Sequence, residues 1–586
     1  MTKYCFLFLV WCVAISSLSA QVLPGVEDFN ELKDTKPVNQ QAWDQFGKKI
    51  IVSWGTKDVR YSKTNVPALG KVEKKWKTSA WKGERVHEQA LIWGGVGCKG
   101  ITPVVSDLVG PGGSRIPAAA VKANFVRYVM TDELNKGGKG GCGYRPDKTK
   151  FDSSLVADMI DVIPVRDLEA RNTQPVWVSV QVPLNAKAGV YKGKVKFQTA
   201  GVKLPALDIE LRVLDKSLPA PKDWAFHLDL WQHPFSVARY YNVPLWSDEH
   251  LELMRPLMKI LADAGQKVIT ATLLHAPWGG QTHDKFESMV MRIKKLDGSW
   301  SFDYAVFDKW VEYMMSMGID KQINCFSMIP WKLSFQYFDQ ASNTLKYLDA
   351  KVGTPGYNDY WRAFLKDFAA HLKQKGWFEI TTIAMDERPM ASMQQVIKLV
   401  KEADPNYKVA LAGNYHKEIE ADLYDYCVAS GQFFSPEVLA ARKAAGKVST
   451  VYTCCTEPYP NTFSFSPTAE AVWLPLYASA KGFDGYLRWA YNSWTENPLP
   501  DTRFHTWAAG DCYLVYPGGR SSIRMERLVE GIQMFEKIRI LREQYKDQPE
   551  KLAALEQALA GFDISVLAKR PAAEMVNAVN AEINKL

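Results

Sequence analysis

The sequence predicts a multidomain chain: an N-terminal antiparallel β-sandwich, then a (β/α)8 TIM barrel, then a short C-terminal helical segment. Two patterns in its 586 residues predict this fold class. Apolar and polar residues alternate up to about residue 218, as they do in half-buried strands. Beyond that point, helix-like stretches that end in glycine alternate with β-prone runs. We assign residues 21–218 to the sandwich, 219–545 to the barrel and 546–586 to the helical segment.

The N-terminal residues 1–20 are predicted to be a secretory signal peptide. Lys3 precedes the apolar run YCFLFLVWCVAI, and SSLSAQV then supplies the small residues that signal peptidase requires. Cys12 follows Trp11 inside the apolar run, so we expect no lipoprotein cleavage site. No later segment is apolar and long enough to span a bilayer. The sequence therefore predicts an exported protein, periplasmic or extracellular, without integral membrane association.

The charge and cysteine content argue against several classes of protein. The formal net charge is +8 and no dense run of Lys and Arg occurs, so nucleic-acid binding is not expected. The spacing of the cysteines resembles no zinc site, and we expect neither a metal nor a cofactor. Cys98 and Cys142 lie in glycine-rich segments of the same region and could form a disulfide; buried free thiols are the alternative.

Three successive runs predict the strands of the sandwich. VWVSVQVPL (176–184) places four valines on one face, which is typical of a half-buried strand. NAKAGVYKGKVKFQ (185–198) adds a turn and a second strand, and LDIELRVLD (207–215) adds a third. No helical stretch separates them, which favours antiparallel pairing. Two prolines in KSLPAPKDW (216–224) then break the pattern and mark the predicted domain boundary.

The barrel is predicted from helix-like stretches that end at Gly265, Gly318 and Gly376, each followed by a β-prone run. Alternating helices and strands imply parallel strand pairing. Eight β-prone runs fit a (β/α)8 barrel, and a doubly wound open sheet is the alternative. The eight runs are residues 225–230, 267–274, 322–329, 379–385, 408–413, 425–430, 448–453 and 485–491.

Polar and aromatic residues gather at the carboxyl ends of these predicted strands, which is where (β/α)8 barrels carry their active sites. The residues are Asp229, Trp231, His233, His275, Trp278, Pro330, Trp331, Asp386, Glu387, Asn414, His416, Tyr452, Glu457, Trp489, Asn492 and Trp494. Aromatic faces stack on sugar rings, and interspersed polar groups bind hydroxyls, so this face is predicted to bind carbohydrate. A metal site is the alternative, although no HExxH motif occurs.

Two adjacent acids, Asp386 and Glu387, end the fourth predicted barrel strand in TTIAMDERPM. Most retaining glycosidases use two carboxylates about 5 Å apart on either side of the scissile bond, an arrangement that adjacent residues do not easily make. Both can serve if the substrate's 2-acetamido group is itself the nucleophile. Asp386 would then orient the acetamido N–H while Glu387 acts as acid and base. A simple strand-ending turn, with Asp386 as a cap and Arg388 paired to an acid, is the alternative.

Three stretches of the chain resemble glycoside hydrolase family 123: AMDERP, GYLRWAYNSWTENPLPD and GDCYLVYPGGRSSIRMERLVEGIQMFEKIRILRE. The resemblance covers the region after residue 220 and, more loosely, the preceding sandwich. It implies an exo-acting, retaining β-N-acetylgalactosaminidase that releases terminal β-linked GalNAc, for example from glycosphingolipid glycans. It also implies that Glu387 is the acid/base, that Asp386 orients the acetamido group, and that Trp489 and Trp494 line the sugar subsite.

Further substrate-binding residues, His275, Asn414 and Tyr452, are predicted from strand-end position only. The expected partner is a carbohydrate with terminal β-GalNAc, with no cofactor, and the sequence assigns no oligomeric state. Two other functions stay open. One is a retaining glycosidase that uses Glu457 as nucleophile on a sugar without an acetamido group, and the other is a non-catalytic glycan-binding surface protein.

Overall fold

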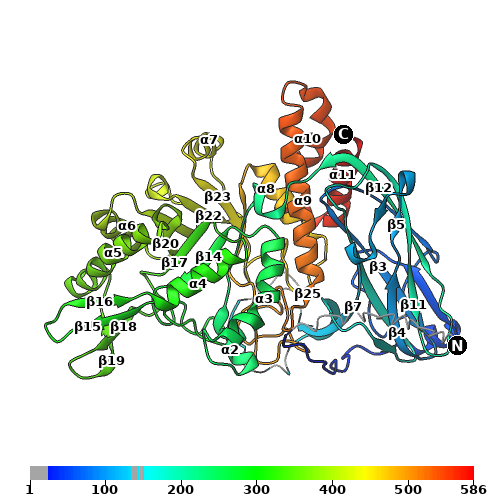
Figure 1. The fold of residues 1–586 in the computed structure, drawn as a ribbon, viewed down its shortest axis with the longest axis horizontal. Helices are drawn as coiled ribbons and strands as arrows, with labels where there is room; N and C mark the ends of the chain where they lie inside the picture. The colour runs from blue at the N-terminus through cyan, green and yellow to red at the C-terminus, as the bar shows by residue number, and fades with distance from the viewer. Residues whose placement is uncertain (1–23, 133–141, 146, 148, 150) are drawn as a thin grey trace, which may run out of the picture.

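The computed structural model describes residues 24–132, 142–145, 147, 149 and 151–586. Figure 1 shows a β-rich part at the N-terminal end, a strand-and-helix barrel beside it, and helices at the C-terminal end. The predicted fold class is therefore confirmed. The predicted signal peptide, residues 1–20, lies outside the described residues.

The N-terminal part contains two β-sheets with the strand orders β1-β3-β10-β7-β8-β25 and β2-β12-β11-β4-β9, the short β5 and β6 joining the second along β11. Neighbouring strands are antiparallel except β12 and β2. A short helix, α1 (Gln40–Phe46), precedes them. The strands are β1 (Ile50–Trp54), β2 (Lys75–Lys82), β3 (Arg85–Gly94), β4 (Cys98–Val105), β5 (Leu108–Val109), β6 (Arg115–Ile116), β7 (Val121–Asp132), β8 (Ser153–Ile160), β9 (Arg166–Leu168), β10 (Asn172–Gln181), β11 (Gly189–Gln198), β12 (Leu207–Ser217) and β25 (Ser521–Ser522).

The central strand β10 is buried on both faces, whereas its alternating sequence predicts one exposed face. Val176, Val178 and Val180 face the core between the two sheets, as predicted. On the other face Trp177 is only 2% exposed and packs in a cluster with Ile523 of the barrel region. The sheet is therefore covered on its second face by the barrel, which sequence alternation within one strand does not reveal.

The barrel is a sheet of eight parallel strands in the order β13-β24-β23-β22-β21-β20-β17-β14. A bridge between Leu228 of the first strand and Gln266, two residues before the last strand begins, nearly closes it. All eight coincide with the predicted runs. They are β13 (His227–Leu230), β14 (Val268–Thr272), β17 (Gln322–Phe326), β20 (Thr381–Asp386), β21 (Lys408–Gly413), β22 (Asp425–Ala429), β23 (Val448–Tyr452) and β24 (Gly485–Arg488).

Helices cover the outside of this barrel, with one departure from the regular pattern. The helices are α2 (Pro234–Tyr241), α3 (Asp248–Asp263), α4 (Ala305–Ser316), α5 (Pro355–Lys375), α6 (Met390–Ala403), α7 (Pro436–Ala444), α8 (Glu470–Lys481) and α9 (Ile523–Gln544). The fully described connection between β21 and β22 contains only the 3-10 turn Glu420–Asp422 in place of an α-helix.

Two of the strand-to-helix connections are enlarged into a separate four-stranded sheet, which the sequence did not predict. Its order is β16-β15-β18-β19, and it projects from the barrel at the end opposite the sandwich (Figure 1). The strands are β15 (Met291–Lys294), β16 (Trp300–Asp303), β18 (Ser334–Asp339) and β19 (Thr344–Asp349). In (β/α)8 enzymes the connections that leave the carboxyl ends of the strands surround the active site, so this sheet enlarges the face on which a site is expected.

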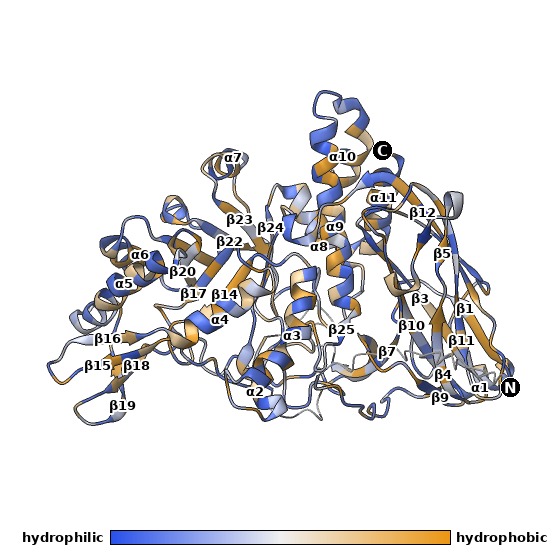
Figure 2. Cartoon of the chain, in the orientation of Figure 1, coloured by the Kyte–Doolittle hydropathy of each residue, from blue (hydrophilic) through white to orange (hydrophobic). Residues whose placement is uncertain are grey.

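Helix α9 stands between the barrel and the sandwich (Figure 1) and is buried although it carries many charges. Its charges are paired across the boundary: Arg527 contacts Asp58 at 2.6 Å, and Lys537 contacts Glu84 at 2.5 Å. In Figure 2 hydrophobic colour lies on strands of both parts and on stretches of the helices, including α9 and α10. Removing one partner of such a buried pair costs about 3–5 kcal/mol, so the two parts are held in one arrangement.

A disulfide joins Cys142 to Cys455, so the Cys98–Cys142 pair that the sequence left open does not form. Cys98 is a buried free thiol on β4, 5% exposed, and packs in the core between the two sheets. Cys142 instead lies in the connection between β7 and β8 and reaches the loop after β23, 313 residues further along the chain. The bond therefore crosses from the sandwich to the barrel, which cysteine spacing alone cannot indicate.

The chain ends in α10 (Pro549–Ala560) and α11 (Ala572–Lys585), as predicted for a helical segment. The apolar side of α11, with Met575, Val576, Val579 and Ile583, is buried in the main core. Among the helices that the structure describes, none combines the length and apolar character needed to cross a bilayer.

Candidate active site

A cavity of ≈ 230 Å³ lies at the carboxyl ends of the barrel strands. Because β20 ends at Asp386 and β23 ends at Tyr452, both strands deliver their last residue to it. The lining residues are Trp231, Trp278, Gln281, Asp386, Glu387, Ala412, Tyr452, Cys454, Cys455, Leu487, Trp489, Trp507 and Asp511. The cavity therefore combines indole rings with three carboxylates.

Asp386 is the last residue of β20, and five buried residues precede it. Its Oδ2 atom accepts a hydrogen bond from the indole Nε1 of Trp331 at 3.2 Å and forms an ion pair with Arg388 at 2.6 Å. Its Oδ1 atom is buried and has no hydrogen-bond partner among the described residues. Burial raises the pKa of Asp386, and the Arg388 cation partly offsets that rise. The free oxygen is thus an acceptor available to a ligand.

Glu387 follows directly but has left the strand, so both acids line the same cavity. The backbone N–H of Asn414 donates to its Oε2, and the Asn414 side-chain amide donates to its Oε1 at 3.0 Å. His416 Nε2 lies 3.2 Å from the same Oε1. The Glu387 side chain is 32% exposed, more than the 21% of Asp386. Glu387 is therefore the acid that solvent and a leaving group can reach.

Gly413, the last residue of β21, makes room for the Glu387 side chain. A Cβ atom at this position would lie 2.7 Å from Glu387 Oε2 and 2.8 Å from Glu387 Cβ. Real Cβ contacts are essentially never that short. The observed position of the Glu387 carboxylate therefore depends on glycine at this neighbouring strand end.

Four tryptophans form the aromatic part of the cavity wall. Trp231 stacks on Trp278 with ring centroids 5.0 Å apart, and Trp489 meets Trp507 edge to face at 6.0 Å. Trp507 is fixed by a hydrogen bond from its Nε1 to the carbonyl of Gln281 at 2.8 Å. Aromatic faces beside charged hydrogen-bonding groups are the combination that binds sugar rings.

A third carboxylate, Asp511, lines the cavity and was missed by the sequence analysis. It is fully buried and pairs with Arg488, the last residue of β24, at 2.6 Å. Strand-end reasoning overlooked it because it lies in the long segment between β24 and β25. The available signal was its place in GDCYLVYPGGR, part of the stretch that resembles the family.

Two regions of the sequence match domains of known proteins. Residues 231–541 match the glycoside hydrolase 123 catalytic domain, and residues 54–199 match the glycoside hydrolase 123 N-terminal domain. The first match spans more than half of the chain. The chain belongs to glycoside hydrolase family 123.

The structure of this family 123 glycoside hydrolase is similar to a solved one. A family 123 glycoside hydrolase from Clostridium perfringens, analysed for glycolipid glycan hydrolysis, superposes with a TM-score of 0.82 at 24% identity, over 92% of this chain and 98% of that one. A GH5 xyloglucanase from Bacteroides ovatus aligns over 78% of this chain and 98% of that one, with 10% identity and a TM-score of only 0.28. The first likeness supports the shared fold. A search of curated proteins finds no matching sequence.

The structure brings together most of the predicted site residues. Asp386, Glu387, Tyr452 and Trp489 line the cavity, and Asn414 binds Glu387 from the next strand. Their roles toward a substrate stay predictions. In residues 24–132, 142–145 and 151–586 no three side chains of His, Cys, Asp or Glu gather as a metal site would need.

Two predicted substrate-binding residues lie elsewhere. Trp494 is 0% exposed, donates from Nε1 to the carbonyl of Val515 at 2.8 Å and packs on Tyr240, so its assignment to the sugar subsite is corrected. His275 lines a separate cavity of ≈ 300 Å³ beside the four-stranded sheet, where its Nδ1 lies 2.6 Å from Glu287. Strand-end position indicates the height of a residue in the barrel but not the direction of its side chain.

Glu457, the alternative nucleophile, is not among the cavity-lining residues. Its Oε1 accepts a hydrogen bond from Ser430 Oγ at 3.0 Å. Its Oε2 accepts from the Cys454 backbone N–H at 2.8 Å and from Thr456 Oγ1 at 2.9 Å. These contacts hold the carboxylate in the loop after β23.

Proposed function

We propose that this glycoside hydrolase is an exo-acting, retaining β-N-acetylgalactosaminidase that uses substrate-assisted catalysis. One observation carries the proposal: two consecutive acids line one cavity, and the deeper acid has a buried oxygen that no described residue hydrogen-bonds. This oxygen can accept a hydrogen bond from an acetamido N–H. Such a group, once oriented, is itself the nucleophile of the substrate-assisted glycosidases.

In the first step the acetamido carbonyl oxygen attacks the anomeric carbon, and the bond to the leaving-group oxygen breaks. Glu387 donates its proton to that oxygen, since it is the more exposed acid. Asp386 accepts the acetamido N–H and stabilises the positive charge of the oxazolinium intermediate. Water then attacks the anomeric carbon, and Glu387 takes a proton from the water. The bond between that carbon and the acetamido oxygen breaks, which opens the oxazolinium ring and restores the acetamido group. Two inversions at one carbon give net retention.

The size of the cavity supports exo action. At ≈ 230 Å³ it is smaller than the ~300–1,000 Å³ of typical ligand sites. A space of this size fits one terminal sugar better than the middle of a chain. We assign terminal β-linked GalNAc on glycans such as those of glycosphingolipids from the resemblance to the family, whose Clostridium perfringens member was analysed for glycolipid glycan hydrolysis.

We also propose that the enzyme is exported to the periplasm or the extracellular space. The first twenty residues have the composition of a signal peptide. The Cys142–Cys455 disulfide supports this location, because disulfides persist in oxidising compartments. Detecting the mature N-terminus in the culture medium or periplasmic extract, against retention of the full chain in the cytoplasm, tests the proposal.

A panel of 4-nitrophenyl β-glycosides assayed with the wild type, Asp386→Asn and Glu387→Gln tests the activity. We expect selective turnover of the N-acetyl sugars, a kcat loss of about 10²–10³-fold for Asp386→Asn and about 10²–10⁴-fold for Glu387→Gln. A thiazoline analogue of the intermediate should inhibit the wild type. Equal turnover of glycosides without the acetamido group would refute the mechanism.

The same panel, with a 2-deoxy-2-fluoro glycoside added, separates the two alternative functions. A glycosidase with a protein nucleophile such as Glu457 would be trapped covalently by a 2-deoxy-2-fluoro glycoside, and the label would map to that residue. A non-catalytic glycan-binding protein would show no turnover with any glycoside, and Glu387→Gln would leave its properties unchanged.

A further inference from the structure

Asp511 is a buried carboxylate of the cavity to which the proposed mechanism assigns no role. Its Oδ1 pairs with Arg488 at 2.6 Å and accepts a hydrogen bond from Trp489 Nε1 at 3.3 Å. Its Oδ2 is buried and has no partner in the part of the chain that the structure describes. A buried carboxylate oxygen without a donor is costly, so such an atom in a cavity wall points to a ligand.

Three other cavity-lining side chains have the same property. Asp386 Oδ1 is a buried acceptor, Trp231 Nε1 and Trp278 Nε1 are buried donors, and all three lack partners among the described residues. With Asp511 Oδ2, the small cavity thus presents two acceptors and two donors that the described residues do not satisfy. A sugar presents N–H and O–H donors and oxygen acceptors around one ring, which matches this set.

Arg488 keeps Asp511 in place and charged at neutral pH. Burial raises the pKa of Asp511 to about 6, although the Arg488 cation opposes the rise. The second amino group of Arg488 donates to Asn461 Oδ1 at 2.9 Å, so the guanidinium is itself fixed. A carboxylate held by an immobile cation cannot turn away from the cavity, and its second oxygen stays directed at whatever occupies it.

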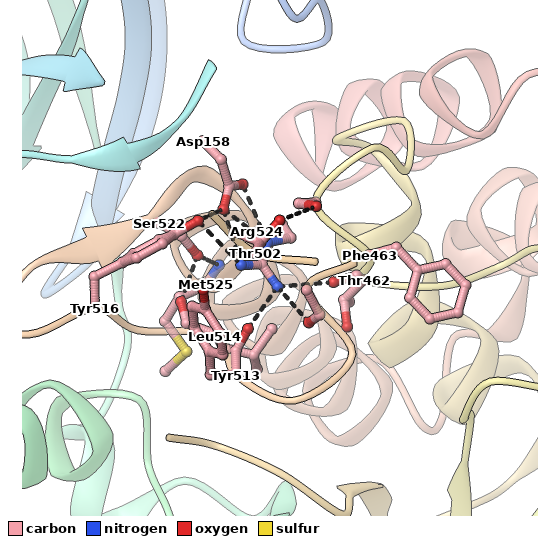
Figure 3. Close-up of polar contacts among 12 residues, drawn as sticks. Asp158, Thr462, Phe463, Thr502, Tyr513, Leu514, Tyr516, Ser522, Arg524 and Met525 are labelled. Carbon is pink, nitrogen blue, oxygen red and sulfur yellow. Dashed lines mark hydrogen bonds and ion pairs between the residues drawn. The ribbon is translucent and has the colours of Figure 1, made fainter. Parts of the chain in front are cut away.

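The loop that carries Asp511 is organised by Arg524 of α9, and Figure 3 shows Arg524 among its contacts, which include Asp158, Thr462 and Tyr513. The Arg524 Nη1 donates to the backbone carbonyls of Thr462, Gly510 and Tyr513 at 3.0, 2.9 and 2.8 Å. The Arg524 charge is balanced by Asp158 of the sandwich strand β8, 2.8 Å away. Asp158 is therefore a positioning residue: it fixes Arg524, which binds backbone carbonyls on both sides of Asp511.

We propose that Asp511 Oδ2 accepts a hydroxyl hydrogen of the terminal sugar and determines which sugar the enzyme cleaves. The inference rests on the proposed function, in which Asp386 binds the acetamido group of the same ring. Asp511 then binds a hydroxyl elsewhere on the ring. Because that oxygen is buried and negative, a sulfate or a further sugar on this hydroxyl is excluded. This selects an unsubstituted terminal residue.

The test uses whichever 4-nitrophenyl β-glycoside the wild type hydrolyses, together with its 3-, 4- and 6-deoxy analogues. We expect one deoxy analogue to lose about 10- to 100-fold in kcat/KM with the wild type, the range for a hydrogen bond to a charged group. Asp511→Asn should lose a similar factor with the parent glycoside, mainly through KM. With that deoxy analogue, Asp511→Asn should lower kcat/KM little further, because the hydrogen bond between the hydroxyl and Asp511 is already absent.

Glu536→Gln is the matched control. Glu536 is also buried, but it accepts a hydrogen bond from the Phe226 backbone N–H at 2.8 Å and does not line the cavity. We expect this variant to keep wild-type discrimination among the analogues. Thermal unfolding of both variants shows whether they fold.

If Asp511→Asn discriminates among the analogues as the wild type does, the proposal is overturned, whatever happens to total activity. A wild type that accepts every deoxy analogue equally, or cleaves the O-sulfated sugars, overturns it without any variant. Covalent labelling of Asp511 by a fluoro-sugar would make it the nucleophile instead. Failure of the proposed function is distinct, since it appears as hydrolysis of sugars that lack the acetamido group.

Discussion

Gly413→Ala should disable Glu387 without replacing it. The added Cβ would lie 2.7 Å from Glu387 Oε2 and 2.8 Å from Glu387 Cβ, so the side chain must move by several tenths of an ångström or more. That movement weakens the hydrogen bonds from Asn414, each worth about 1.5–3 kcal/mol for a charged group. A displacement of about 1 Å at a reacting group costs about 10²-fold in rate. We therefore expect kcat to fall by about 10- to 100-fold.

The assay compares substrates with good and poor leaving groups, 4-nitrophenyl and methyl β-glycosides of the same sugar. Because a displaced Glu387 protonates the leaving group poorly, the loss should be larger for the methyl glycoside. Gly431→Ala is the matched control, since a Cβ there meets no atom within 4 Å. Wild-type kcat in Gly413→Ala with both substrates would refute the reasoning that close contact at this glycine positions the acid.

Four further predictions concern pH and stability. Trp331→Phe removes the indole donor to Asp386, which should raise the pKa of that carboxyl and move the acid limb of the kcat–pH profile to higher pH. An unshifted profile would contradict this. KM should rise as pH falls through about 6, because protonation of Asp511 removes the proposed hydroxyl acceptor, and Asp511→Asn should abolish that dependence. Asp158→Asn leaves a buried arginine without its partner, so we expect a loss of about 3–5 kcal/mol in unfolding free energy, measured with denaturant, together with weaker discrimination among the deoxy sugars. Cys142→Ser removes the disulfide and should cost about 2–5 kcal/mol, seen as a lower melting temperature that reducing agent does not lower further.

The barrel strands could be predicted because each is a short apolar run that stands between turn or helix-end signals. The same local logic located Asp386 and Glu387, since a strand of buried residues must stop where two acids follow. The fifth connection could not be predicted, because its 3-10 turn leaves the flanking strand patterns unchanged. The four-stranded sheet was missed because most residues of its strands are exposed or only partly buried, so no strand forms a continuous apolar run.

Site residues were predicted well where they end a strand and poorly where they come from long connections. Asp511 and Trp507 both lie in the segment after β24, and only folding carries them back to the cavity. Trp494 shows the converse error: a tryptophan close to a strand end that turns into the core. Side-chain direction depends on neighbouring segments, so a position along one strand does not determine it.

The sequence by itself determined the fold class, the eight strands, the acidic pair and the family, because these follow from local periodicity and from contiguous motifs. The tertiary structure decided which residues share the cavity, which cysteines pair and how the sandwich supports the catalytic face. Those features join residues hundreds of positions apart, as in the contact between Asp158 and Arg524. Contacts of that kind depend on how whole elements pack, and no local pattern records them.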